Sequence, residues 1–195
     1  MKTIIKTITA ALSFLLIFSC TKQNVSKPSA SANASSSANS TTAFHIGQSF
    51  GGGIIFYIDN TGQHGLIAAI NDQGTGISWN KNGKNINTGA KATAVGTGNA
   101  NTTKIVNAQS KTGTYAALLC FKYKHNGFTD WYLPSKDELN LLYQQRNVVG
   151  GLGATNYWSS SEVSRGKAWD QEFGGGFQFK DTKSFTLNVR AVSSF

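Results

Sequence analysis

The run "DWYLPSKDELNLLYQQR", residues 130–146, limits the possible folds more than any other stretch of this chain. Ser135 is followed three residues later by Glu138, which is the spacing of a capping box. In that motif the serine hydroxyl accepts the amide N–H of the glutamate, and the carboxylate accepts the amide N–H of the serine. Pro134 cannot continue a strand and presets the backbone for entry into a helix. Leucines then recur at helical spacing. We therefore expect a helix that begins after Ser135 and buries one face.

The first nineteen residues have the pattern of a secretory signal peptide. Lys2 and Lys6 give the chain a positively charged start. They precede an apolar run, residues 8–18, which is too short to cross a bilayer as a helix. The run ends in the letters IFSC, and this ending resembles a bacterial lipobox, in which the cysteine becomes acylated. We predict that Cys20 carries acyl chains such as palmitate, each buried methylene contributing about 0.8 kcal/mol to membrane anchoring. The alternative is an ordinary signal peptide with an incidental cysteine.

The residue after the cysteine bears on localisation. It is Thr21 and not aspartate. By resemblance to Gram-negative sorting signals, this favours the outer membrane. We therefore expect a lipid-anchored protein on the periplasmic face or the cell surface.

The remaining chain divides into a tether and one domain. Residues 20–43 are nearly all Ser, Ala, Asn and Thr, so they cannot bury enough apolar surface to become ordered, and we predict a disordered tether. Residues 44–195 have an ordinary size for a single domain. That domain contains one cysteine, Cys120, in the apolar run "YAALLCFKY". We expect a buried, inert thiol and no disulfide, so the core alone must stabilise the fold.

Apolar periodicity within the domain predicts an α+β fold. Apolar runs at 54–58 and 66–70 flank turn residues and predict a β-hairpin. Residues 71–101 are polar and glycine-rich, and we expect a long loop there. The pattern then becomes helical from Thr102, breaks at glycine and resumes at 115–123. The C-terminal part predicts short aromatic-rich strands: "YWSSSE", "KAWDQEF", "FQFKD" and "NVRAVSSF".

Several of these strings occur together, in the same order, in a known family. The strings are "GGGIIFYID", "GTGNANTTKIV", "YAALLC", "DWYLPSKDELNLLY", "YWSSSE", "AWDQEF" and "VRAVSSF". Across nearly all of residues 46–195 the chain resembles the C-terminal domain of Legionella collagen-like proteins, and it is similar to the related fibrobacter major paralogous domains. The resemblance implies a C-type-lectin-like fold, with two main helices packed on short twisted antiparallel sheets and the chain ends close together. It also implies an adhesin that binds sulfated polysaccharides, often as a homotrimer.

Catalytic and metal-binding patterns are weak throughout the sequence. The serines of "YWSSSE" lack the glycine-flanked elbow of hydrolases, and the two carboxylates at the start of the predicted helix complement its dipole. Three acidic residues near the C-terminal strands offer the hard oxygens that calcium prefers, but we interpret them as surface carboxylates: Asp170, Glu172 and Asp181. The three histidines lack zinc-ligand spacing. We therefore expect no enzymatic activity, no cofactor and no bound metal.

Basic residues suggest where a ligand could bind. Arg165 and Lys167 fall in one predicted turn, and Lys180 and Lys183 fall in the next connection. If the two turns adjoin, four cations gather beside Trp169, and guanidinium and ammonium groups both suit sulfate or carboxylate. We therefore predict these five residues as the ligand-binding site. The alternative is a solvated rim of unrelated charges.

These observations predict a non-enzymatic surface lipoprotein whose lectin-like domain binds polyanionic glycans or surface polymers in an adhesin-like role. The overall excess of basic over acidic residues favours such partners. The alternative is a structural or assembly component of the envelope that binds a protein partner. We expect no specific nucleic-acid binding, because an exported chain without an arginine-dense recognition helix lacks the usual features.

Overall fold

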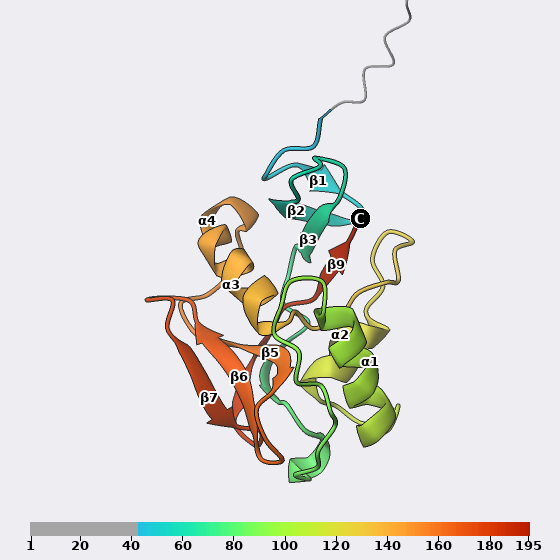
Figure 1. The fold of residues 1–195 in the computed structure, drawn as a ribbon, viewed down its shortest axis with the longest axis vertical. Helices are drawn as coiled ribbons and strands as arrows, with labels where there is room; N and C mark the ends of the chain where they lie inside the picture. Colours follow the sequence, from blue (N-terminus) through green and yellow to red (C-terminus); the bar gives the residue numbers. More distant parts are fainter. Residues whose placement is uncertain (1–42) are drawn as a thin grey trace, which may run out of the picture. The chain divides into compact units, whose positions relative to one another are not determined.

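Residues 43–195 are described in a computed structural model (Figure 1). The predicted signal peptide, the lipidation site at Cys20 and the tether through residue 42 lie outside the described residues. The described part contains four α-helices and two β-sheets, so the predicted α+β class is confirmed. None of the helices within 43–195 combines the length and the apolar character needed to cross a membrane.

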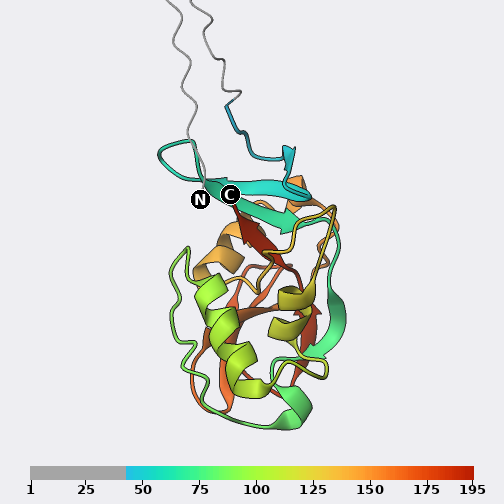
Figure 2. The same ribbon diagram turned by 90° about the vertical axis from the view of Figure 1, so that its right-hand side faces the viewer.

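The smaller sheet brings the two ends of the described chain together. Its strand order is β1 (Ser49–Phe50), β2 (Gly53–Ile58), β3 (Gly65–Ala69) and β9 (Val192–Ser194). β2 and β3 form the predicted hairpin. Beyond β9, Phe195 and Gly65 exchange backbone hydrogen bonds of 3.1 and 3.2 Å. The ring of Phe44 lies 4.8 Å from that of Phe195, centroid to centroid, so both ends lie at the same end of the domain (Figures 1 and 2).

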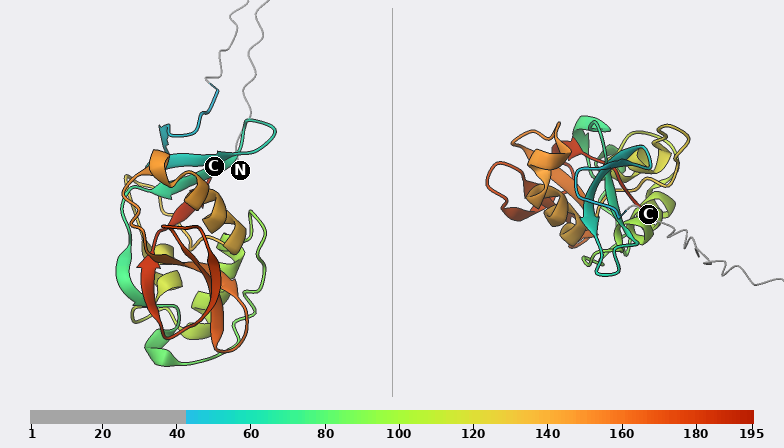
Figure 3. Two further views of the ribbon diagram at one scale, coloured as in Figure 1. Left: turned by 90° about the vertical axis from the view of Figure 1, so that its left-hand side faces the viewer. Right: turned by 90° about the horizontal axis from the view of Figure 1, so that it is seen from above.

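The larger sheet has the strand order β4 (Gly74–Ser78), β8 (Thr186–Val189), β5 (Asn156–Glu162), β6 (Lys167–Glu172) and β7 (Gln178–Thr182). Neighbouring strands are antiparallel except for β5 and β8. β7 is therefore an edge strand, and it lies at the front when the domain is turned to show that side (Figure 3, left).

The run "NVRAVSSF" does not form the single strand that its pattern predicts. It is divided between β8 in the larger sheet and β9 in the smaller one. Arg190 lies at the division with its side chain buried, and its Nε donates to the carboxylate of Asp72 at 2.7 Å. The same guanidinium donates to the carbonyls of Ala69 and Ile70 at 2.8 and 3.1 Å. These bonds fix the chain where it passes from one sheet to the other.

The helices lie on opposite sides of the domain (Figures 1 and 3). On one side are α1 (Gly98–Gln109) and α2 (Ala116–Lys122), and on the other are α3 (Lys136–Gln144) and α4 (Arg146–Val149). α1 begins four residues before the predicted start, because its first turn is polar. Asn101 and Thr102 are nonetheless buried, and their side chains bond the backbone of Ala92 and Leu133.

Two clusters of apolar side chains form the core. The first lies between α1, α2 and the larger sheet and includes Trp79, Trp131, Trp158 and Ile105. Cys120 is fully buried in this cluster, and burial raises the pKa of its thiol far above the usual value. The second cluster packs α3 against β2, β5 and β9. The prediction that Cys120 is buried is confirmed.

The capping box at the start of α3 is confirmed. The amide of Glu138 donates to the Ser135 hydroxyl at 3.3 Å, and the amide of Ser135 donates to the Glu138 carboxylate at 2.7 Å. Glu138 is fully buried and accepts a further N–H from Gly96 at 2.8 Å. Asp137 is different: its side chain is 44% exposed and pairs with Lys136 at 3.2 Å. The two carboxylates therefore have separate structural roles.

The predicted loop at 71–101 is partly wrong. It contains β4, a short 3-10 helix η1 (Lys81–Gly83) and the start of α1. β4 has the sequence "GTGIS", which carries no strand periodicity, and its conformation follows from pairing with β8. The longest part of this segment without a helix or strand is residues 84–97, here called the connecting loop.

Candidate functional site

The two connections that the predicted site needs side by side do adjoin, but only Arg165 and Lys183 lie within them, because Lys167 begins β6 and Lys180 lies within β7. β6 and β7 pair in register, with Trp169 opposite Lys180 and Lys167 opposite Thr182. Beyond the last pair, the amide of Lys183 donates to the carbonyl of Gly166 at 2.9 Å. The β5–β6 and β7–β8 connections therefore lie side by side, which is the condition on which the predicted site depends.

Trp169 lies beside two ammonium groups. The Nζ of Lys180 is 4.9 Å from the centre of its ring, and the Nζ of Lys136 is 5.1 Å from it. An ammonium over an indole at an exposed site gains about 0.5–1 kcal/mol and keeps its charge. Of the two cations, Lys136 also pairs with Asp137 at 3.2 Å, whereas Lys180 has no acidic partner within residues 43–195. Lys136 was not among the predicted residues, because it reaches Trp169 from the first turn of α3. No local pattern in the sequence indicates that this turn packs beside β6.

Arg165 is exposed in the β5–β6 connection, and Lys167 is exposed at the first position of β6. The Nε of Arg165 donates to the carbonyl of Asn85 at 2.8 Å, which attaches this connection to the start of the connecting loop. Within residues 43–195, neither Arg165, Lys167 nor Lys180 forms an ion pair with an acidic residue. We call this group, in which Lys136 and Trp169 are half-buried and the other three side chains are exposed, the β6–β7 platform: Lys136, Arg165, Lys167, Trp169 and Lys180.

Lys183 does not belong to this platform, and its predicted place among the exposed cations is corrected. Its side chain is fully buried, with Nζ 2.6 Å from a carboxylate oxygen of Glu162. The same Nζ donates to the carbonyls of Ile86 and Arg165 at 3.0 and 3.1 Å. An ammonium has three N–H donors, so three acceptors satisfy it completely. It also lies 4.2 Å from the centre of the Trp79 ring.

Glu162 connects this buried cation to the connecting loop. Its carboxylate accepts the amide N–H groups of Thr88 and Gly89, each at 2.9 Å. Burial tends to raise the pKa of Glu162, but the hydrogen bonds from Lys183, Thr88 and Gly89 outweigh it and hold the pKa below its usual value. Glu162 is therefore a buried anion at neutral pH, and the ion pair fixes the loop that lies against Arg165.

The serines before Glu162 have structural roles, as the sequence predicts. All three are buried in β5. Their hydroxyls donate to backbone carbonyls: Ser159 to Trp169 at 2.8 Å, Ser160 to Pro134 at 3.2 Å and Ser161 to Ala92 at 2.8 Å.

The C-terminal carboxylates are not all at the surface, and the interpretation of Asp170 is corrected. Asp170 is only 1% exposed; one oxygen accepts from Asn156 at 2.7 Å, while the other has no hydrogen-bond partner within the described chain. Burial, with support from nearby Asp181 and against the Asn156 hydrogen bond, raises the pKa of Asp170 to about 6. Among residues 43–195, no three His, Cys, Asp or Glu side chains gather closely enough to hold a metal ion.

A second basic feature is visible in the sequence but is not part of the predicted site. Residues 73–129 contain no Asp or Glu and seven lysines: Lys81, Lys84, Lys91, Lys104, Lys111, Lys122 and Lys124. In the described structure none of these seven forms an ion pair. The segment contains β4, η1, the connecting loop, α1 and α2, so these elements carry only positive formal charge.

The buried ion pair can be tested by removing its cation. Lys183→Met leaves the Glu162 carboxylate uncompensated, and we expect a loss of about 3–5 kcal/mol in the free energy of unfolding measured by urea denaturation. The matched control is Lys180→Met on the exposed part of β7, which should cost about 1 kcal/mol or less. Equal stability of the two variants would contradict the assignment of Lys183 to the interior.

Asp170 predicts a pH dependence of stability. Its folded-state pKa is raised from 3.8 to about 6, so the folded state holds the proton more tightly than the unfolded state. The tighter proton binding contributes to the stability of the folded state. This stabilisation is fully present below the unfolded pKa and is lost as pH rises through about 6. Asp170→Asn should therefore gain stability relative to the parent protein as pH rises from 4 to 7.5, measured as the difference in melting temperature. If the melting temperature of the variant minus that of the parent stays constant or falls as pH rises, the raised pKa of Asp170 is refuted.

Comparison with known proteins agrees with the resemblance drawn from the sequence. The sequence model of one family, described as the Lcl C-terminal domain, matches residues 68–193. The match begins in β3 and ends in β9, so it includes the capping box, the β6–β7 platform and the connecting loop. No curated protein matches the chain. Because the family match covers well over half of its residues, the chain belongs to the Lcl C-terminal domain family.

Proposed function

We propose that this domain binds polyanionic glycans or surface polymers, sulfated or acidic, through the β6–β7 platform, in an adhesin-like role without catalysis. The observation that carries the proposal is the exposure of Arg165, Lys167 and Lys180 beside Trp169, with no acidic partner within residues 43–195. A guanidinium fork and separate ammonium groups can each bind a sulfate or carboxylate. Several such contacts along one polymer add together, and salt should weaken them.

The position of the platform supports display to an outside partner. The connection between β5 and β6, which contains Arg165, lies at the end of the domain opposite the C-terminal residue Phe195 (Figure 1). Phe44 packs against Phe195, so the described chain begins at the end of the domain opposite this connection. This orientation suits a domain that meets a polymer at the far side of its attachment.

The same proposal includes the finer fold and the location of the protein. Nearby chain ends, helices on two sides and a long irregular connection are compatible with a C-type-lectin-like arrangement. Family membership favours a role at the cell surface. We further propose an outer-membrane lipoprotein, anchored through acylated Cys20 and assembled as a homotrimer, as the sequence resemblances imply.

One observation favours a second candidate function, binding of a protein partner within the envelope. Three large aromatic side chains are exposed on or beside the edge strand β7: Phe177 at 68%, Phe179 at 43% and Phe185 at 52%. An edge strand with exposed aromatic residues is a typical site for protein association. Retention of one stoichiometric protein partner, together with no signal on a glycan array, would favour this candidate over the first.

Chromatography on immobilised heparin tests the proposed function. The parent protein should be retained and elute at moderate salt, and the triple variant Arg165→Gln, Lys167→Gln, Lys180→Gln should elute at clearly lower salt with an unchanged melting temperature. The control triple variant Lys91→Gln, Lys122→Gln, Lys124→Gln removes the same charge from exposed positions elsewhere and should elute close to the parent. Equal shifts for both triple variants would mean that net charge alone causes retention. No retention of the parent would reject polyanion binding.

A further inference from the structure

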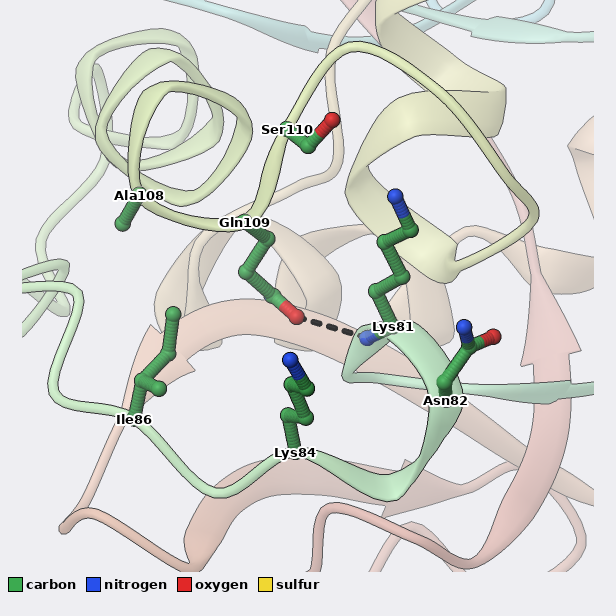
Figure 4. A pocket seen from close by; sticks show the side chains of 7 residues that line it. All are labelled: Lys81, Asn82, Lys84, Ile86, Ala108, Gln109 and Ser110. Atoms are coloured by element: carbon green, nitrogen blue, oxygen red, sulfur yellow. Dashed lines mark hydrogen bonds between the residues drawn. The ribbon is translucent and has the colours of Figure 1, made fainter.

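A pocket of about 360 Å³ lies between η1 and the C-terminal end of α1. Lys81, Lys84 and Ile86 line it from one side, and Ala108 and Gln109 line it from α1 (Figure 4). Its volume is at the small end of the range for ligand sites, about 300–1,000 Å³. We call it the η1–α1 pocket.

Hydrogen bonds within the protein fix the walls of this pocket. The amide of Lys81 donates to the side-chain oxygen of Gln109 at 2.6 Å (Figure 4). Gln109 is itself mostly buried, so its amide group is held in place. The turn of η1 closes through the amide of Lys84, which donates to the carbonyl of Lys81 at 3.1 Å, and Asn82 adopts a left-handed conformation with φ of 52°. A site that is formed in advance loses less entropy when it binds a ligand.

The two lysines of the pocket differ in what they contact. The Nζ of Lys81 donates to the Thr112 hydroxyl at 3.0 Å, near the end of α1, where a cation also complements the helix dipole. The charge of Lys81 therefore has a structural explanation. Lys84 has none: its ammonium makes no hydrogen bond or ion pair within the part of the chain that the structure describes. Its side chain extends from the η1 side toward Gln109 (Figure 4).

The surroundings of the pocket favour an anion. The acid-free segment 73–129 supplies every lining residue, so the lining contains no carboxylate that would compete for the lysines. Ile86 and Ala108 add apolar surface beside the cations, and Asn82, Gln109 and Ser110 add groups that can bond hydroxyls. A ligand with an anionic group, a ring and several hydroxyls would match all three kinds of surface.

We propose that the η1–α1 pocket binds one acidic sugar unit, that is, a sugar ring carrying a sulfate, carboxylate or phosphate group. Lys84 holds the anionic group, together with the N–H donors of Lys81 that its bond to Thr112 does not use, while Ile86 and Ala108 contact the ring. The pocket adjoins the β6–β7 platform, because Asn85 follows Lys84 in the chain and accepts from Arg165. A polymer bound at the platform can therefore place one unit in the pocket. This last step rests on the proposed function, whereas binding of a single sugar does not.

Titration of the full chain with glucose 6-sulfate, followed by amide chemical shifts, tests the proposal. Saturable shifts should appear in η1 and at the end of α1, and unsulfated glucose should produce none at the same concentration. Glucuronate and glucose 6-phosphate distinguish the anionic groups: binding of either one shows which acid the pocket accepts besides sulfate. Equal binding of glucose and glucose 6-sulfate would overturn the role of the lysines.

Three variants separate the pocket from general charge. Lys84→Gln should weaken glucose 6-sulfate binding about tenfold, because one charge-assisted hydrogen bond is lost. Ala108→Phe fills the pocket without changing the charge and should abolish binding while leaving most heparin retention. Lys122→Gln removes the same charge from α2 and should bind like the parent. Binding that survives Ala108→Phe, or that Lys122→Gln weakens as much as Lys84→Gln, would reject the site. Heparin retention tests the platform, and glucose 6-sulfate binding tests the pocket. Either proposal can therefore be rejected while the other stands.

Discussion

Two buried glutamates hold the connecting loop in place, and the cationic surfaces depend on that loop. Residues 84–97 have no strand ladder or helix to satisfy their backbone N–H groups, so other acceptors are required. Glu162 accepts from Thr88 and Gly89 at one end of the loop, and Glu138 accepts from Gly96 at the other. Serine hydroxyls in turn satisfy carbonyl groups of the loop. Ser161 donates to the carbonyl of Ala92, and Ser135 donates to that of Ala94.

This arrangement relates the interior of the domain to its surface. The carboxylate that fixes the loop, Glu162, is neutralised from within by Lys183. The start of the same loop lines the η1–α1 pocket through Lys84 and Ile86, and the adjacent Asn85 accepts from Arg165. A buried cation thus positions the exposed cations that we propose as ligand contacts. Breaking the ion pair should disturb both surfaces together, which is why stability controls are needed in any binding experiment on this domain.

Features that depend on residues close in sequence could be predicted well. The capping box at Ser135, the hairpin of β2 and β3 and the burial of Cys120 follow from local pattern. Features that depend on distant partners could not. The conformation of β4 comes from β8, more than a hundred residues later, and Lys183 turns inward because Glu162 lies there. Lys136 reaches Trp169 only because α3 packs beside β6. The acid-free segment is readable from the sequence, but only the fold shows that it encloses a pocket.

Native-state amide hydrogen exchange in the connecting loop tests this account most directly. The amides of Thr88, Gly89 and Gly96 donate to buried carboxylates, whereas those of Asn87 and Lys91 in the same loop have no protein acceptor within residues 43–195. If the two glutamates order the loop, the first three amides should exchange slower than the other two by an order of magnitude or more, after correction for intrinsic rates. Uniformly fast exchange across the loop, at the rates of an unstructured peptide, would contradict the account.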